Sequence, residues 1–313
     1  MIDVVDDINL PSEIYTPCTE PGYRPAFAGH EARDLNLVVE GGALRGIFAA
    51  GALDFLMDMG VWAKNLVGVS AGSLCGFNYV SGQRGRTVYI NTRFCNEWRY
   101  LSLLSFFVTG DAYGVQFAFH DVPAKYSPQD DAAFMQSPCK LIAPCTNLVT
   151  GKADYPQVVD PAQDWPILRA SSAMPFVSHN VDILGAPHLD GGVADPIPFE
   201  RSLEIGADKH IVLLTQDRDY FKEENRKFSI GRLVYRDYPA FCETMEKRHL
   251  VYNGQRKRVA ELHEKGEVFA IYPPVRPDVA RMETSRLKVF SLYLEGYIEA
   301  QRQWPALKAY LES

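Results

Sequence analysis

The feature that most constrains the fold is a strand–turn–helix pattern that occurs twice near the start of the chain. The apolar run at 35–39 is followed by a glycine-rich turn, and residues 47–59 then place apolar side chains at helical spacing. A second apolar run at 65–69 ends at Ser70, and a helix is predicted to begin at Ala71. Strands that alternate with helices in this way favour an α/β fold, with a mainly parallel sheet that helices cover on both faces.

The rest of the chain continues this alternation. Residues 84–126 are rich in aromatic side chains and are predicted to be helical with a loop at 109–111, and residues 147–160 are typical of a hairpin that turns at 150–152. Further strands are expected at 140–143, 209–214 and 268–272, and further helices at 165–173, 198–205, 248–265 and 284–302. The chain shows neither an internal repeat nor a low-complexity tract.

Composition and charge exclude several classes of protein. Of the 313 residues, 47% are hydrophobic and 23% are charged, which is typical of a globular protein and excludes a disordered, collagen-like or coiled-coil chain. The formal net charge of −7 argues against overall attraction to nucleic acid, so no nucleic-acid partner is expected. The six cysteines form no C-x-x-C pair, which excludes zinc-ribbon and thioredoxin signatures.

The amino terminus does not have the pattern of a secretory signal peptide. Residues 1–15 carry acidic side chains where a signal peptide has basic ones, and they contain no apolar core. No apolar run in the sequence reaches the ~20 residues that a membrane-spanning helix needs. These features predict a cytoplasmic protein, with peripheral membrane contact left open.

A G-x-S-x-G motif lies at the end of the second predicted strand. Gly68, Ser70 and Gly72 belong to the sequence GVSAG between a predicted strand and a predicted helix, which is the context that a nucleophilic serine requires. Small neighbours permit a strained turn that exposes the serine Oγ, and the next N–H group begins a helix whose positive end favours an oxyanion. The alternative is a glycine-rich turn in which the serine has no catalytic role.

The glycine-rich turn after the first strand runs from Gly41 to Gly46 and has the sequence GGALRG. Ala43 occupies the middle-glycine position of a dinucleotide-binding G-x-G-x-x-G motif, and the Gly-Lys-Ser/Thr of a P-loop is absent, so no nucleotide cofactor is expected. Two interpretations are open. The turn presents backbone N–H groups to an anion, here a reaction oxyanion, or it only allows close packing of helix against sheet.

A third motif consists of Asp190, Gly191 and Gly192, and it lies 120 residues after Ser70 at the predicted end of a strand. A serine needs a base to become a nucleophile, and an aspartate within hydrogen-bond distance can accept its proton. An aspartate with the usual pKa of about 3.9 is a weak base at neutral pH. Most of the reduction in the barrier is therefore expected from the oxyanion donors.

A Ser-His-Asp triad is the competing arrangement. The chain order serine, aspartate, histidine offers His210, His249 and His263 as the base. The first lies in a predicted strand and the other two lie in charged helical stretches, so a structural or solvent-exposed histidine is the favoured interpretation of each. His188 is expected to line the pocket beside Asp190 without taking part in the reaction.

Taken together, the motifs EGGALRG, GVSAG and DGGVADPIP and the sequence RASSAMPF at 169–176 resemble those of the patatin-like phospholipase family over residues 35–215. The TNLVTGK stretch at 146–152 fits bacterial members of that family. The resemblance implies a three-layer α/β/α sandwich that hydrolyses lipid acyl esters with a Ser-Asp dyad. No metal or other cofactor is expected, because Ser70 supplies the nucleophile and no cluster has metal-ligand spacing.

The resemblance also assigns roles to the residues of the motifs. It implies Ser70 as the nucleophile and Asp190 as the proton acceptor. It implies oxyanion donors at Gly41, Gly42 and Ala43. The alanine stands where the family usually has glycine, and because a Cβ disfavours positive φ, the loop is expected to adopt a conformation that a Cβ tolerates.

Further positions are expected to support this site. Arg45 matches a basic position of the family; pairing with a core carboxylate is its favoured role, and approach to a phosphate is the alternative. Small residues are expected at the tight turns around the dyad. These supporting glycines are Gly46, Gly68, Gly72, Gly191 and Gly192.

The leading functional prediction is a serine hydrolase that releases fatty acid from phospholipid or lysophospholipid through an acyl-enzyme intermediate. Its predicted partner is a lipid acyl ester, with a membrane surface as the setting. One alternative is a carboxylesterase or thioesterase for soluble acyl substrates, which predicts dependence on a histidine. The other is a catalytically silent lipid-binding module, which predicts lipid binding without labelling of Ser70 by a fluorophosphonate.

Three regions of the chain are expected. They are an irregular amino-terminal arm at 1–30, a patatin-like catalytic core at 31–220 and a mostly helical extension at 221–313 packed on the same domain. The apolar segment at 101–108 is interpreted as a lid, as the wall of an acyl-chain site or as plain core. The nine basic residues between 226 and 258 are interpreted as a solvated helical face rather than as a patch for anionic membranes.

Overall fold

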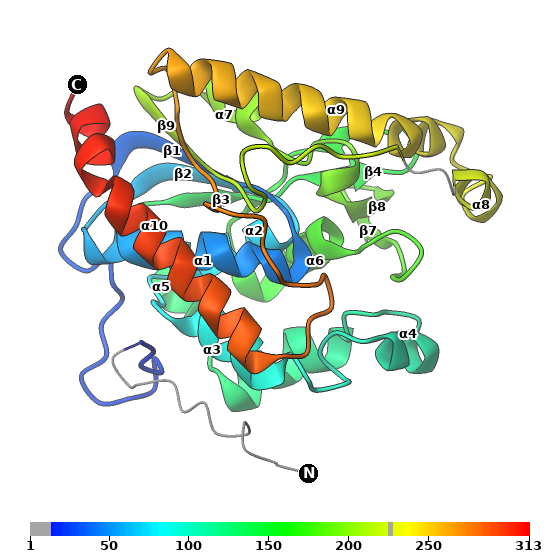
Figure 1. The fold of residues 1–313 in the computed structure, drawn as a ribbon. Coiled ribbons are helices and arrows are strands. Elements are labelled where there is room, and N and C mark those ends of the chain that lie inside the picture. Colours follow the sequence, from blue (N-terminus) through cyan, green and yellow to red (C-terminus); the bar gives the residue numbers. More distant parts are fainter. Residues whose placement is uncertain (1–13, 225–227) are drawn as a thin grey trace, which may run out of the picture.

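A computed structural model describes residues 14–224 and 228–313, and a six-stranded sheet forms its centre (Figure 1). From one edge to the other the strands are β10 (Phe269–Ile271), β9 (Lys209–Leu213), β1 (Arg33–Val39), β2 (Ala63–Gly68), β3 (Lys140–Ile142) and β6 (Gln157–Val158). Neighbouring strands are parallel except for β3 and β6. The predicted mainly parallel sheet is confirmed, and every strand expected from an apolar run lies in it.

Helices cover both faces of this sheet and give the three-layer α/β/α architecture. Side chains alternate along β1, since Leu37 and Val39 belong to the apolar core on one face and Val38 belongs to the core on the other. The first core includes α1 (Ile47–Asp58), α2 (Ala71–Val80), α6 (Pro161–Ser172) and α10 (Arg286–Glu312), and the second includes α7 (Phe199–Ile205) and α9 (Pro239–Glu264). Burial on both faces explains why these strands are continuous apolar runs rather than alternating ones.

A second, smaller sheet was not expected from the sequence. Its four antiparallel strands are β5 (Ala153–Asp154), β4 (Cys145–Asn147), β8 (Ala186–Asp190) and β7 (Val181–Ile183). The expected hairpin turning at 150–152 is confirmed as the β4–β5 pair, but residues 157 and 158 instead form β6 at the edge of the larger sheet. Strands of two to five residues are too short for a periodic pattern to reveal them. This sheet carries Asp190 at the end of β8.

The aromatic region after α2 is helical, as predicted. It contains α3 (Arg86–Phe94), α4 (Leu103–Thr109), a π-helix (Phe117–Tyr126) and α5 (Asp131–Gln136), and the chain turns after α4 near the expected loop at 109–111. The apolar α4 lies on the surface, where the side chains of Leu103 and Phe107 are 55% and 79% exposed. The plain-core interpretation of the segment at 101–108 is therefore wrong for α4. Only Leu101, just before the helix, lines an internal cavity.

Three helices begin or end away from their predicted limits. α6 begins at Pro161 rather than at 165, because the Asp160 carboxylate caps its first turn. α9 begins at Pro239, nine residues before the predicted start at 248, and α10 continues ten residues past 302. α10 extends through Pro305 because its last turns still pack on the protein: Leu307 is fully buried, and the Tyr310 hydroxyl accepts a hydrogen bond from the backbone N–H of His210. Packing outweighs the helix-breaking tendency of proline here.

The part of the predicted amino-terminal arm that the structure describes, residues 14–30, consists of turns without helix or strand. Residues 1–13 of the predicted arm lie outside the described residues. Tyr15 anchors the arm, since its ring is buried and its hydroxyl lies 2.8 Å from the Ser127 Oγ.

Most of the basic residues between 226 and 258 do form a solvated face. Their ion pairs are Arg232–Glu246, Arg236–Asp237, Lys247–Glu243, Lys257–Glu261 and Arg258–Glu261. The prediction is wrong for Arg248 and Arg256, whose guanidinium groups point into the protein and donate to the backbone carbonyls of Gly192 and Asp217. Arg226 and Lys227 lie outside the described residues.

Among the described helices, none combines the length and apolarity needed to cross a membrane.

The last helix, α10, crosses α1 at very close range (Figure 1). Each helix has a glycine at the crossing: a Cβ on Gly51 would overlap the carbonyl of Tyr293, and a Cβ on Gly296 would overlap that of Phe48. The two backbones therefore touch, and a residue without a side chain is required on each helix.

We expect the substitution Gly296→Ala to destabilise the fold by about 3 kcal/mol, because the added methyl group forces α10 away from α1. Urea unfolding measures this change in free energy. The matched control is Gly254→Ala on α9, where a Cβ meets no atom within 4 Å. Its helix propensity should stabilise the protein by up to ~1 kcal/mol. Equal effects of the two substitutions would contradict the close crossing.

Candidate active site

Ser70 lies at the sharp turn between β2 and α2. Its φ and ψ are 58° and −125°, in a region that residues with a Cβ rarely adopt. The strain is held by the elements on either side, because β2 ends at Gly68 and α2 begins at Ala71. The predicted turn with a strained serine is present.

The glycines of the two predicted turns lie where backbones meet. A Cβ on Gly68 would come within 2.5 Å of the Gly72 carbonyl oxygen, and a Cβ on Gly72 would overlap the carbonyl of Val39 at the end of β1. Gly46 packs against Ala71, where a Cβ would be 2.7 Å from the alanine Cβ. The turns around Ser70 therefore have no room for larger residues.

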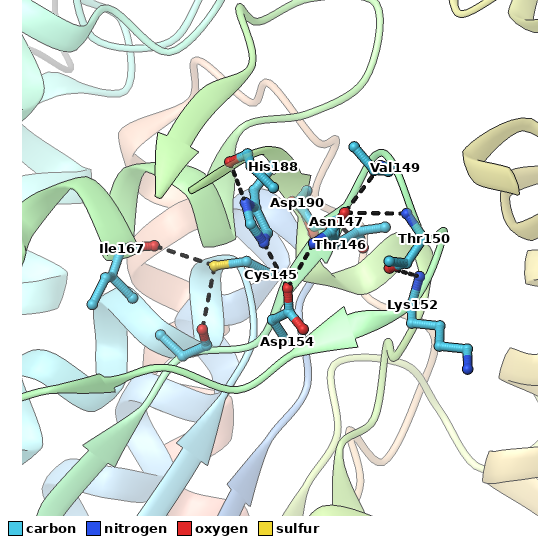
Figure 2. Close-up of polar contacts among 12 residues, drawn as sticks. Cys145, Thr146, Asn147, Val149, Thr150, Lys152, Asp154, Ile167, His188 and Asp190 are labelled. Atoms are coloured by element: carbon cyan, nitrogen blue, oxygen red, sulfur yellow. Dashed lines mark hydrogen bonds and ion pairs between the residues drawn. The ribbon is translucent and has the colours of Figure 1, made fainter. Parts of the chain in front are cut away.

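The structure brings together Ser70 and Asp190, which are 120 residues apart in the sequence. The Ser70 Oγ donates a hydrogen bond of 2.6 Å to Oδ2 of Asp190. The other carboxylate oxygen, Oδ1, accepts a 2.7 Å bond from the N–H of Gly192. The Asp190 backbone is fixed by the Thr146 Oγ, which donates to its carbonyl at 2.8 Å, and both residues lie in the small sheet (Figure 2). Gly191 packs on the Pro144 carbonyl with no space for a Cβ.

A further serine, which sequence reasoning did not single out, supports this pair. The Oγ of Ser171 accepts a 3.1 Å hydrogen bond from the backbone N–H of Ser70 and donates at 2.7 Å to the carbonyl of Pro144. Ser171 thus links the strained turn at Ser70 to Pro144, which lies in the connection between β3 and β4. The only sequence signal for it was its place within RASSAMPF.

The environment of Asp190 changes its acidity. Burial raises the pKa of the Asp190 carboxyl above its usual range. The hydrogen bond from Ser70, the charge of Arg248, the bond from Gly192 and the charge of Arg281 all oppose this rise without cancelling it. A raised pKa makes the carboxylate a stronger proton acceptor than an ordinary aspartate, so the expectation of a weak base needs correction.

The glycine-rich turn lies beside Ser70 and presents unpaired donors. Within the described residues, the N–H groups of Gly41, Gly42 and Ala43 donate to no protein acceptor. A Cβ on Gly41 would lie 3.0 Å from that of Ser70, so the two turns are in contact. The N–H of Ala71, at the start of α2, likewise has no acceptor in the described part of the chain. Such donors are what an oxyanion requires.

Ala43 does not adopt the conformation that its Cβ led us to expect. Its φ is 50°, in the left-handed region, where an alanine costs about 1 kcal/mol relative to a glycine. The neighbouring contacts compensate, because Thr215 Oγ donates to the Gly41 carbonyl at 3.2 Å and the Leu44 N–H donates to the Arg281 carbonyl at 3.5 Å. The loop therefore keeps a glycine-like geometry with an alanine in it.

Arg45 does not pair with a carboxylate among the described residues, so its favoured structural role is wrong. Its Nε is buried and has no hydrogen-bond partner. The nearby Glu40 carboxylate is instead bonded to the Thr215 N–H at 2.6 Å and to the Tyr252 hydroxyl at 2.5 Å. Arg45 faces a cavity beside Ser70.

None of the seven histidines, all within the described residues, hydrogen-bonds to Ser70 or Asp190. His188 is fully buried and bonds Oδ2 of Asp154 at 2.8 Å, as Figure 2 shows, so the prediction that it lines the pocket is wrong. His210 lies in β9 and bonds Ser202, and His263 lies in α9 near the Val268 carbonyl. His249 lines the cavity beside Ser70, but its ring contacts the Glu246 carbonyl of its own helix.

Two cavities meet at Ser70. The first has a volume of about 650 Å³ and is lined mainly by apolar side chains, among them Leu74, Phe77, Ile90, Leu101, Phe119 and Leu168. The second has a volume of about 830 Å³ and contains a group of basic side chains: Arg45, Lys222, Arg248, Arg276 and Arg281. Ala43, Ser70 and Met174 border both cavities. The serine therefore lies between an apolar space and a charged one.

Comparison with known proteins identifies the family of this α/β protein, in which a serine at a strand–helix turn is hydrogen-bonded to a carboxylate. The patatin-like phospholipase family model matches residues 37–202, more than half of the chain. The chain therefore belongs to the patatin-like phospholipase family, as the resemblance predicted. A second model, a domain of unknown function called DUF6363, matches residues 238–312.

Two individual proteins are similar to this chain. The uncharacterized protein YjjU of Escherichia coli strain K12 is 27% identical over 245 residues, which cover 76% of this chain and 68% of YjjU. The crystal structure of VipD from Legionella pneumophila aligns with a TM-score of 0.40 and 11% identity, covering 90% of this chain and 67% of VipD.

Proposed function

We propose that this protein is a serine acyl-ester hydrolase that releases a fatty acid from phospholipid or lysophospholipid. The observation that carries the proposal is the 2.6 Å hydrogen bond between Ser70 Oγ and Asp190 Oδ2 beside a loop with free N–H groups. Membership of the patatin-like phospholipase family supports a lipid acyl ester as the substrate.

The reaction proceeds in two steps. In the first, Ser70 Oγ attacks the acyl carbonyl carbon while Asp190 accepts the hydroxyl proton, and the free N–H groups stabilise the oxyanion. Collapse of the tetrahedral intermediate breaks the ester bond, and the protonated carboxyl returns its proton to the leaving alcohol. In the second step, water loses a proton to Asp190 and attacks the acyl carbonyl carbon. Collapse of this second tetrahedral intermediate breaks the acyl–Oγ bond and releases the fatty acid, and the protonated Asp190 returns its proton to Ser70 Oγ.

The apolar cavity supports a lipid substrate over a small soluble ester. Its lining is mainly apolar and includes Ser70, so an acyl chain bound there places its carbonyl at the Oγ. The exposed α4 follows Leu101, which lines the same cavity. The lid interpretation of the segment at 101–108 remains a prediction.

Covalent labelling tests the proposal directly. We expect a fluorophosphonate probe to modify the wild-type protein at Ser70, identified by mass spectrometry of the labelled peptide, and to leave Ser70→Ala unmodified. The same protein is then incubated with mixed phospholipids, and released fatty acid is measured. A wild-type protein that is folded but neither labels at Ser70 nor releases fatty acid would be a silent lipid-binding module, and the proposal would be wrong.

The charge of Arg248 is expected to determine the pH at which kcat/KM falls on the acid side of its pH profile. Turnover requires ionised Asp190, and Arg248 stabilises that ionised form. Arg248→Gln removes this positive charge, so the pKa of Asp190 rises further and the acid limb of the kcat/KM profile moves to higher pH, by about one pH unit. The profile is measured with an uncharged p-nitrophenyl ester.

Two controls complete this experiment. Arg248→Lys keeps the charge and should keep the acid limb near its wild-type position. Lys247→Gln, at the next residue of α9, removes a charge that pairs with Glu243 at the surface and should have no effect. An acid limb that is the same in all variants would show that the group titrating is not Asp190.

A further inference from the structure

The charged cavity contains more positive charge than its surroundings balance. Its basic side chains come from four separate segments: the glycine-rich turn, the loop after β9, helix α9 and the loop before α10. None of Arg45, Lys222, Arg248 or Arg281 forms an ion pair with a carboxylate in the described part of the chain, whereas other basic residues of α9 do. An unpaired group of cations in a cavity is suited to an anion.

These cations lie close to one another. Burial lowers the pKa of Lys222 to about 7, with the charges of Arg248 and Arg281 adding to the effect, and burial followed by the charge of Arg281 lowers that of Arg45. The fold holds these like charges together, because the backbone that carries Lys222 is fixed by hydrogen bonds. Asn253 on α9 bonds both the N–H and the carbonyl of Lys222, at 2.9 and 3.0 Å.

The carboxylates that border the cavity are engaged elsewhere or lie at its rim. Glu40 is bonded by Thr215 and Tyr252, as described above. Asp190 holds Ser70, and Glu246 pairs with Arg232 at 2.8 Å. Glu223 is exposed at the surface. These carboxylates act on the cations through their charge, but none forms a direct ion pair with Arg45, Lys222, Arg248 or Arg281 in the described part of the chain.

The aromatic rings in this cavity argue against a choline head group. A quaternary ammonium is recognised by open aromatic faces. Here Lys222 Nζ lies 5.1 Å from the centre of the Tyr252 ring, and the Arg276 guanidinium lies 5.6 Å from that of Tyr220. The protein's own cations occupy the positions that a choline would need, and they would repel it.

From this arrangement we infer that the charged cavity is a head-group site that binds the phosphate of an anionic phospholipid, and that it favours a phosphate monoester over a phosphocholine. Lys222, Arg248 and Arg281 are its principal ligands, and Arg45 also lines it. The inference rests on the proposed function and names the substrate class of that site. Because both cavities border Ser70, one molecule can place its acyl chain in the apolar cavity and its phosphate among the cations.

This inference also gives a role to the carboxyl-terminal part of the chain. Arg248 and Arg281 lie within residues 238–312, which match the domain of unknown function, and Lys222 lies just before it. The matched patatin-like residues 37–202 supply the dyad, and of the lysine and arginine side chains in the charged cavity they supply only Arg45. The carboxyl-terminal segment thus supplies most of the selectivity for the head group.

Binding to the full-length Ser70→Ala protein tests the inference without any requirement for turnover. Three probes with the same decanoyl chain are titrated below their micelle concentrations: lysophosphatidate, lysophosphatidylcholine and monodecanoylglycerol. We expect lysophosphatidate to bind at least about tenfold more tightly than the other two. Adding Lys222→Gln or Arg281→Gln should reduce its affinity by about tenfold each, measured relative to monodecanoylglycerol.

Controls separate this effect from a general disturbance of the site. Lys222→Arg keeps the charge and should keep the preference, and Lys247→Gln on the outer face of α9 should match the parent. Equal affinities for the three decanoyl probes would overturn the inference. Inorganic phosphate that binds as tightly as lysophosphatidate would overturn it too, because the site would then be one for free phosphate. Fluorophosphonate labelling of the wild-type protein reports separately on the proposed function.

Discussion

Ester hydrolysis is expected to fall by about 10⁵- to 10⁶-fold when Ser70 is replaced by alanine, because the covalent route through the acyl-enzyme is lost. The residual rate would come from the free N–H groups of the glycine-rich turn, which the substitution leaves in place. The measurement is kcat/KM for a p-nitrophenyl acyl ester, together with fatty acid release from phospholipid.

The strained backbone at residue 70 makes a folding control necessary. Alanine at φ 58° is strained as serine is, so Ser70→Ala should keep the wild-type circular dichroism spectrum and nearly the same unfolding midpoint. Ser81→Ala is the matched control, since Ser81 is a buried serine at the far end of α2 and borders neither cavity. It should retain activity within about threefold. A Ser70→Ala protein with wild-type turnover would rule out Ser70 as the nucleophile.

The substitution Asp190→Asn is expected to reduce turnover by about 10⁴-fold, because an amide cannot accept the proton of Ser70. Its side-chain oxygen can still accept the hydrogen bond from Gly192, so the geometry of the turn should persist. The comparison variant is His249→Gln, the histidine that borders the cavity. Retained activity in Asp190→Asn with loss in His249→Gln would favour a histidine-based triad instead.

Asp190→Asn is expected to increase the stability of the folded protein, although it reduces turnover. Burial raises the pKa of Asp190 in the folded protein above its unfolded value, so folding favours the protonated form. The stability that this residue contributes is fully present below the unfolded pKa and is lost as pH rises through the folded pKa. Asp190→Asn should therefore be more stable than wild type at neutral pH, and this advantage should vanish in acid. Chemical unfolding at several pH values checks the sign.

The sequence was sufficient for those parts of the molecule that depend on local pattern. The runs at 35–39 and 65–69 are buried on both faces, so they stand out as strands, and the glycines around Ser70 mark turns where backbones touch. The pairing of Ser70 with Asp190 was predicted because a serine at such a turn needs a base. The matched range of the family model, residues 37–202, includes both residues.

Other parts depend on contacts that no local pattern encodes. Lys222, Arg248 and Arg281 lie in segments without a motif, and only the fold brings them together. Arg45 was expected to pair with a core carboxylate, but it faces a cavity that distant residues form. The small sheet escaped prediction since its strands are stabilised by pairing with each other rather than by a periodic apolar face.

The contact between α1 and α10 limits how this chain can be recombined with its relatives. α1 follows the glycine-rich turn directly, and α10 begins five residues after Arg281. The two glycines at the crossing therefore fix the spacing between the glycine-rich turn beside Ser70 and the loop that carries Arg281. A chimera that joins the first two thirds of this protein to the tail of another would need a glycine at each of these two positions to keep that spacing.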